Sequence, residues 1–301
     1  MSAGGTAGVD LSDLLARCRF PAPGTAVTCA VSGGADSLAL LVLAVSAGCV
    51  TTAVHVDHGL RSGSAAEADV VAMAAARFGA GFRAVRVAVT PGPNLEARAR
   101  EARYGALPHD VVTGHTADDQ AETVLLNLLR GAGTAGLAGM RRDRRPLLDL
   151  RRTDTVALCA EFGLSPVVDP TNTSPAWRRN RVRHELLPLL DDIAERDVVP
   201  VLGRQADLLR DDEDLLDELA AVIDVTDARA LAAAPRPLAR RAVRRWLAVD
   251  HPPDAATVER VLAVAGGASR ACDVGLGRRV ERHAMRLHLV GLAGLPAEVA
   301  G

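Results

Sequence analysis

The chain contains no lysine, and all 35 of its Lys and Arg positions are arginine. This absence excludes a Walker A phosphate loop, which needs a lysine directly after its last glycine. Aromatic residues make up 2% of the sequence and hydrophobic residues 49%, so the core must be built from Ala, Val and Leu. The formal net charge of −2 excludes a general basic field, so any nucleic acid must be bound by local arginine patches.

Metal-binding cysteine pairs and long apolar runs are also absent from the sequence. Its five cysteines stand at no metal-ligand spacing such as C-x-x-C, and we expect them to be reduced thiols. No uncharged apolar stretch reaches the length of about 18 residues that a membrane helix needs. The N-terminus lacks the basic and apolar regions of a secretory signal peptide. We therefore expect a cytoplasmic protein without a membrane partner.

A glycine-rich loop stands between an apolar strand, expected at 26–29, and an apolar helix, expected at 38–43. The loop consists of Ser32, Gly33, Gly34, Ala35, Asp36 and Ser37. Adjacent glycines allow several backbone N–H groups to converge on one hollow, and the start of the helix adds its positive dipole end. The loop therefore predicts a cradle for a polyphosphate, with an ordinary strand–turn–helix corner as the alternative.

Two side chains at the end of this loop suit phosphate chemistry. Asp36 can hold a magnesium ion against phosphate oxygens, and Ser37 can cap the helix or donate a hydrogen bond to a phosphate. The loop resembles the pyrophosphate-loop signature of the adenylating ATPases, which cleave ATP between its α- and β-phosphates. That resemblance implies that residues 32–37 bind ATP.

Apolar strands alternate with helices after this loop. Further strands are expected at 50–56, 82–89 and 110–113, and helices at 64–78, 94–107 and 117–129. The alternation predicts an α/β fold with a doubly wound parallel sheet. Ligands of such sheets bind beyond the carboxyl ends of the strands, where the segments 32–37, 55–61 and 113–119 meet. One ATP site can therefore include His55 and Gly114.

The pattern becomes helical after about residue 150. Helices are expected at 153–162, 175–190 and 191–221, and the last carries an acidic cluster at 211–214 that we interpret as a solvated face. The remainder is rich in Ala and Arg, with helices expected at 236–249 and 255–265 and strands at 278–280 and 286–290. We predict a catalytic domain with a helical extension at 1–220 and a small second domain at 221–301.

Four titratable groups crowd the start of the helix expected at 117–129. They are His115, Asp118, Asp119 and Glu122. Residues four apart share a helix face, and this helix starts at the ligand edge of the sheet. A single carboxylate at a helix start is usually a cap, but a histidine and three carboxylates within eight residues are better explained as a functional site.

Several motifs together resemble those of the tRNA(Ile)-lysidine synthetases, over residues 26–190. The motifs are the glycine loop, the runs at 56–61, 94–104 and 145–148, the acidic helix followed by glycines at 131, 133 and 136, and the runs at 169–172 and 179–183. The resemblance implies an adenine nucleotide alpha-hydrolase-like, pyrophosphate-loop fold. The tail after about residue 220 carries little of it.

The resemblance implies an ATP-dependent ligase. ATP adenylates the carbonyl oxygen of the wobble cytidine in an isoleucine tRNA with a CAU anticodon, and free L-lysine then displaces AMP to give lysidine. ATP and Mg²⁺ are the implied cofactors, with Asp36 as the metal ligand. Because the reference pKa of lysine is about 10.4, a carboxylate or imidazole must bind its ammonium and accept a proton. We expect Asp119 and Glu122 to bind lysine, with Asp118 or His115 nearer ATP and the metal.

Arginine patches are the candidate contacts for tRNA. They comprise Arg98 and Arg103 on one helix, and Arg178, Arg179 and Arg183 beside Trp177. Arginines bind phosphates through paired hydrogen bonds, and a tryptophan can stack on a splayed base. A solvated helix face is the alternative for the first patch. No obligate protein partner is evident from the sequence.

Other proteins with a pyrophosphate loop are the alternatives. A tRNA thiolase usually carries paired cysteines, and GMP and NAD synthetases use different distal motifs and a source of ammonia. A non-catalytic nucleotide-binding module would keep the glycine cradle without the acidic helix. The presence of His115, Asp118, Asp119 and Glu122 favours the enzyme.

Overall fold

The computed structural model describes residues 9–57, 64–87, 98, 102, 105–167, 174, 177–249 and 251–291. A four-stranded parallel sheet forms its N-terminal part, in the order β3-β2-β1-β4. The strands are β1 (Ala26–Ala30), β2 (Val50–Asp57), β3 (Gly81–Arg86) and β4 (Val112–Thr113). The chain reverses its direction of travel across the sheet between β1 and β4, which confirms the expected doubly wound fold. Ligands of such sheets bind at the carboxyl ends of the two strands that flank the reversal.

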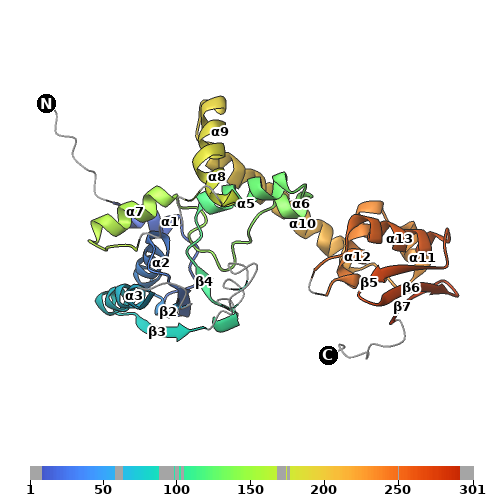
Figure 1. The fold of residues 1–301 in the computed structure, drawn as a ribbon, viewed down its shortest axis with the longest axis horizontal. Helices are drawn as coiled ribbons and strands as arrows, with labels where there is room; N and C mark the ends of the chain where they lie inside the picture. The colour runs from blue at the N-terminus through green and yellow to red at the C-terminus, as the bar shows by residue number, and fades with distance from the viewer. Residues whose placement is uncertain are drawn as a thin grey trace. The chain divides into compact units, whose positions relative to one another are not determined.

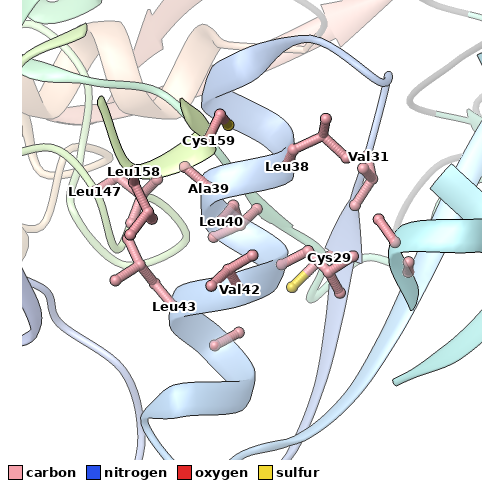
Figure 2. Close-up of a cluster of buried hydrophobic side chains, with 14 of the residues drawn as sticks. Cys29, Val31, Leu38, Ala39, Leu40, Val42, Leu43, Leu147, Leu158 and Cys159 are labelled. Carbon is pink, nitrogen blue, oxygen red and sulfur yellow. The ribbon is translucent and has the colours of Figure 1, made fainter. Parts of the chain in front are cut away.

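Helix α2 (Ala35–Ser46) is the centre of the first hydrophobic core. Its residues from Ser37 to Ala44 are all buried, as expected of a helix that is apolar on every side. Figure 2 shows its side chains between Cys29 and Val31 on one side and Leu147, Leu158 and Cys159 on the other. This packing holds the start of α2, and with it the glycine loop, between β1 and helix α7 (Arg152–Glu161).

The N-terminal part contains further helices. They are α1 (Leu11–Ala16), α3 (Ser64–Phe78), α5 (Ala117–Leu129) and α6 (Thr134–Leu137). Figure 1 shows α3 beside β2 and β3, and α7 beside α2. The expected bounds of α3 and α5 are confirmed, whereas most of the helix expected at 94–107 lies outside the described residues.

The helical extension contains α8 (Arg178–Arg181), a π-helical turn η2 (Val182–Leu186), α9 (Leu187–Ala194) and α10 (Val199–Ala221). The expectation of one continuous helix over 191–221 is wrong. Helix α9 ends at Ala194, and the next residue, Glu195, has a φ of 50° in the left-handed region. The Asp197 carboxylate then accepts a hydrogen bond from the Val199 N–H at 3.0 Å, which caps the new helix.

The chain divides into two compact units at residues 209 and 210, earlier in α10 than the boundary expected at 220 and 221. The second unit contains α11 (Ala228–Ala233), α12 (Arg236–Leu247), α13 (Ala255–Gly266) and the strands β5 (Ala271–Gly275), β6 (Arg278–His283) and β7 (Arg286–Gly291). Its strands form an antiparallel sheet, and α13 lies against β5 and β6 (Figure 1). In the described ranges, no helix is long and apolar enough to cross a membrane.

The acidic cluster at 211–214 is not uniformly solvated, in contrast to the expectation. Glu213 is buried, and its two carboxylate oxygens both accept hydrogen bonds from the Arg241 guanidinium. The same guanidinium also pairs with the exposed Asp217 at 2.8 Å. Because a buried carboxylate requires an opposite charge, this contact joins the C-terminal half of α10 to α12 within the second unit.

Candidate active site

The glycine loop is held by its own serine and by a neighbouring segment. The Ser37 hydroxyl donates to the Gly34 carbonyl at 2.8 Å and accepts from the Ser32 N–H at 3.1 Å, while Gly34 occupies the N-cap position of α2. Gly33 has a φ of +91°, and its carbonyl accepts from the Val167 N–H at 2.9 Å. The Ser37 and Leu38 N–H groups donate to the Gly34 carbonyl at 3.1 and 3.0 Å. The N–H groups that precede them at a helix start have no intrahelical acceptor, and such groups suit an anion.

Gly114 brings the second motif directly against this loop. A Cβ atom at Gly114 would lie 2.5 Å from the Asp36 carbonyl oxygen and 3.2 Å from the Cα of Ser37. Only glycine allows this approach, because the atoms that would collide belong to the backbone. The turn from β4 to α5 and the start of α2 therefore meet at the point where the strand order reverses.

Asp36 is a mostly buried carboxylate at the start of α2. Its Oδ1 accepts a hydrogen bond from the Thr155 hydroxyl, and its Oδ2 lies 3.4 Å from Nε of Arg152. Burial raises its pKa above the ordinary value, and the Thr155 and Arg152 contacts oppose that rise. Because burial disfavours the ionised form of Asp36, a cation placed beside this carboxylate would stabilise that form.

Asp119 lies in the first turn of α5 and is buried. Its Oδ2 accepts from the N–H and hydroxyl of Thr116, and its Oδ1 accepts from Arg152 at 3.0 Å and from Arg179 at 3.1 Å. Burial raises the pKa of Asp119, but Arg152, the Thr116 N–H and Arg179 outweigh it and hold the pKa below its usual range. Asp119 is therefore ionised while it also completes the capping box of α5.

Glu122 is fully buried, with 0% of its side chain exposed, and is bound by three arginines. Nε of Arg179 and Nε of Arg183 each lie 2.6 Å from one of its carboxylate oxygens, and Nη1 of Arg152 lies 3.3 Å away. Arg179 and Arg183 were expected to contact tRNA. The structure places their guanidinium groups on the acidic helix.

Asp118 faces a separate set of partners. Its two oxygens accept from Nη2 and Nε of Arg151, each at 3.1 Å, and Oδ2 also accepts from the Arg152 N–H at 2.8 Å. Burial raises its pKa, but these hydrogen bonds outweigh burial and hold the pKa below the ordinary value. Asp118 thus anchors the start of α7, from which Arg152 reaches the other carboxylates.

The two histidines expected at the site lie on either side of β1, His55 on β2 and His115 in the turn after β4. Nδ1 of His115 lies 2.7 Å from the Thr113 hydroxyl, in the turn that leads into α5. His55 is buried on β2, where its Nδ1 lies 2.9 Å from the Val31 carbonyl, just before the glycine loop. Its Nε2 is buried and has no hydrogen-bond partner among the described residues.

The remaining predicted tRNA contacts lie apart from this cluster or outside the described residues. Arg178 is exposed at the start of α8, next to Trp177, whose side chain is 46% exposed. Nε and Nη2 of Arg98 are buried without a hydrogen-bond partner in the ranges described, and Arg103 lies outside these ranges. The motif residues at 58–61, 94–97 and 169–172 lie outside them as well.

Sequence reasoning missed Arg151 and Arg152. Four carboxylates (Asp36, Asp118, Asp119 and Glu122) face four guanidinium groups (Arg151, Arg152, Arg179 and Arg183). Partly buried carboxylates require opposite charges, so the need for partners was foreseeable, but nothing in the sequence shows which of 35 arginines would supply them.

The comparisons with known proteins identify the family. The family model of the PP-loop domain matches residues 10–190. The tRNA(Ile)-lysidine synthase of Nocardia farcinica is 47% identical over 245 residues, which cover 76% of this chain and 77% of that protein. The enzyme of Rhodococcus erythropolis is 45% identical, over 75% of this chain and 74% of its own length. The enzyme of Thermobifida fusca is 43% identical, over 80% of this chain and 82% of its own length.

A solved structure supports the fold alone. The U34-tRNA thiolase NcsA from Methanococcus maripaludis, solved with its [4Fe-4S] cluster, aligns with a TM-score of 0.53 at 19% identity, covering 66% of this chain and 77% of that one. The parallel sheet agrees with this fold. The branch within the fold is specified by the identity of 43–47% to the three tRNA(Ile)-lysidine synthases. The chain belongs to the tRNA(Ile)-lysidine synthase family.

Proposed function

We propose that this protein ligates free L-lysine to the wobble cytidine of an isoleucine tRNA with a CAU anticodon, in the cytoplasm. ATP adenylates the carbonyl oxygen of the cytosine and pyrophosphate leaves, after which the ε-amine of lysine attacks the activated ring carbon and AMP leaves. The main support is that Asp119 and Glu122 share one buried cluster with Asp36 of the glycine loop. The names of the similar proteins support the choice of tRNA.

The glycine loop is the proposed pyrophosphate site. The N–H groups at the start of α2 and the loop backbone would hold the departing pyrophosphate as its negative charge develops. Only one carboxylate of the loop, Asp36, is available to a metal, and among the described residues no group of three potential ligands forms a ready cage. This fits Mg²⁺, which usually binds one or two carboxylates together with substrate phosphates and neutralises their charge.

The carboxylates of α5 are the proposed lysine site. Asp119 and Glu122 would bind the ε-ammonium, and their negative charge requires the incoming group to be a cation. Both oxygens of Asp118 are committed to Arg151 and to the start of α7, so the geometry favours a positioning role for it. His115, in contact with Thr113 at the end of β4, is the proposed group next to ATP.

The decisive experiment measures which amino acid becomes attached to which tRNA. Radiolabelled lysine, arginine and ornithine are each incubated with the enzyme, ATP, Mg²⁺ and isoleucine tRNA transcripts, and label retained on the tRNA is counted. Of the three amino acids, we expect only lysine to give a stable labelled tRNA. We expect no labelled tRNA when the wobble cytidine is replaced by uridine. ATP binding without any product would instead support a nucleotide-binding module.

A further inference from the structure

Arg152 is the residue that joins the two halves of the proposed site. Its Nε lies 3.4 Å from Asp36 of the glycine loop, while Nη2 lies 3.0 Å from Asp119 and Nη1 lies 3.3 Å from Glu122. Among the described arginines, Arg179 and Arg183 reach Asp119 and Glu122 but only Arg152 also contacts Asp36. The guanidinium of Arg152 therefore binds the carboxylate proposed to hold the metal and, at the same time, the two carboxylates proposed to hold lysine.

The backbone of Arg152 is fixed although its guanidinium lies between several partners. The N–H of Arg152 is held by Asp118, and the preceding Arg151 is bound to the same carboxylate by two hydrogen bonds. The side chain of Arg152 is 26% exposed, so it is not sealed inside the protein. Its contact with Asp36 is the longest of the three.

In the described arrangement the carboxylate cluster has no place for a further cation. Both oxygens of Asp119 and both oxygens of Glu122 already accept hydrogen bonds. Oδ1 of Asp119 accepts from both Arg152 and Arg179. One oxygen of Glu122 accepts from both Arg152 and Arg183. Withdrawal of Arg152 would leave one arginine on each of these oxygens, and a lysine ammonium could then take the second position. A triphosphate in the glycine loop offers that guanidinium an alternative partner, since arginine binds phosphate through paired charge-assisted hydrogen bonds.

We propose that Arg152 is a positioning residue that couples the two substrates: it blocks the lysine carboxylates until Mg²⁺·ATP is bound, and then moves its guanidinium to the triphosphate. This inference rests on the proposed function, because it takes Asp119 and Glu122 as the lysine site. The coupling is reciprocal, so lysine also tightens the binding of the nucleotide by the same factor. Its consequence is that free lysine does not fill the site before ATP does.

The test measures the affinity for radiolabelled lysine by equilibrium dialysis, with and without Mg²⁺ and α,β-methylene-ATP, which cannot be cleaved between its α- and β-phosphates. For the wild-type protein we expect the nucleotide to tighten lysine binding by about 5- to 150-fold. In Arg152→Gln, lysine should bind more tightly than in the wild type when nucleotide is absent, and the ratio with and without nucleotide should approach one. A role in folding alone would not produce this pair of changes.

Arg181→Gln is the matched control. It removes an exposed guanidinium of α8 that pairs with Glu185 and not with the carboxylate cluster, so its coupling ratio should stay close to that of the wild type. Arg152→Lys is the second variant, for use if Arg152→Gln does not fold. It keeps the positive charge, but its single ammonium cannot reach three carboxylates. We expect its coupling to be several-fold weaker, and thermal unfolding of each variant verifies that it is folded.

The outcomes separate this inference from the proposed function. If the wild type binds lysine without coupling to the nucleotide, or if Arg152→Gln and Arg152→Lys keep the full coupling, the inference is overturned and the proposed function stands. If the wild type binds no lysine with any combination of Mg²⁺, nucleotide and isoleucine tRNA, both are overturned. Coupling that is lost in Arg152→Gln and kept in Arg181→Gln supports the inference.

Discussion

At the scale of single residues, the site is a balanced set of opposite charges in which every described cation is a guanidinium. Arginine remains charged at all physiological pH values and presents several donors in one plane, so one side chain can serve two or three carboxylates. Arg152 does this for Asp36, Asp119 and Glu122. The carboxylates were predictable from their spacing, but their occupation by arginines was not.

Asp36→Asn should reduce the formation of lysidine by about 100-fold or more, because a neutral amide cannot hold a cation against the phosphates. The fold should persist, since Asn can keep a hydrogen bond to Thr155. Transfer of labelled lysine measures the activity, and gel shift measures tRNA binding, which should be unchanged. Asp110→Asn, at an exposed carboxylate outside the cluster, is the control. Activity close to that of the wild type in Asp36→Asn would contradict the assignment.

The stability of the first unit should depend on pH through Asp118. Its pKa is lowered in the folded protein, so its stabilising effect is complete above the ordinary value of 3.8 and is lost as pH falls through the folded pKa. Asp118→Asn should therefore cost about 1.5–3 kcal/mol at pH 7, the usual range for hydrogen bonds to a charged group. Urea unfolding should show the difference from wild type shrinking below about pH 4. A difference that stayed constant down to pH 2 would be inconsistent with this ionisation.

At the scale of elements, the site depends on a close approach of two turns that the sequence marks with glycines. The glycine loop needs Gly33 in the left-handed region, and the turn before α5 needs Gly114 because of the Asp36 backbone. Both glycines were expected to bind ATP. In the structure Gly33 permits the left-handed turn of the loop, and Gly114 permits the close approach of the two backbones. The π-helical turn Val182–Leu186 was not foreseeable from the sequence, and it contains Arg183, which reaches Glu122.

Gly114→Ala should weaken ATP binding by about tenfold or more, since a 1 Å displacement of a site can be very costly. The new Cβ would collide with the Asp36 carbonyl and force the two turns apart. Gly203→Ala is the matched control, because a Cβ at Gly203 in α10 meets no atom within 4 Å and the substitution should stabilise the helix by roughly 0.5–1 kcal/mol. Binding of a fluorescent ATP analogue measures the effect. Equal ATP affinities for the two variants would show that the approach at Gly114 is not required.

At the scale of the whole molecule, the chain forms two compact units with separate hydrophobic cores. The first core surrounds α2, and the second is formed by α11 to α13 against the antiparallel sheet, with Val243, Val261 and Val280 fully buried. The sequence predicted a small second domain, and the structure places the division inside α10. The composition of an amphipathic helix does not change where one unit ends and the next begins, so the sequence could not show a boundary inside α10.

Glu213→Gln should destabilise the second unit alone, by about 3–5 kcal/mol, because it leaves the Arg241 guanidinium without its buried partner. Differential scanning calorimetry should resolve two transitions, of which only one shifts to lower temperature. Asp217→Asn is the comparison, since Asp217 pairs with the same guanidinium but is 57% exposed and should contribute less than about 1 kcal/mol. A shift of both transitions, or equal shifts in the two variants, would contradict this account.

The sequence alone determined the alternation of strands and helices around the glycine loop, and the acidic start of α5, because helix periodicity, strand runs and glycine requirements are local properties. Only the tertiary structure decided which cations occupy the acidic site. Arg152 lies 116 residues after Asp36, and Arg179 lies 57 residues after Glu122. Such pairs form only when α7 packs against α2 and α8 against α5. Until that packing selects it, one arginine in an arginine-rich sequence cannot be told from another.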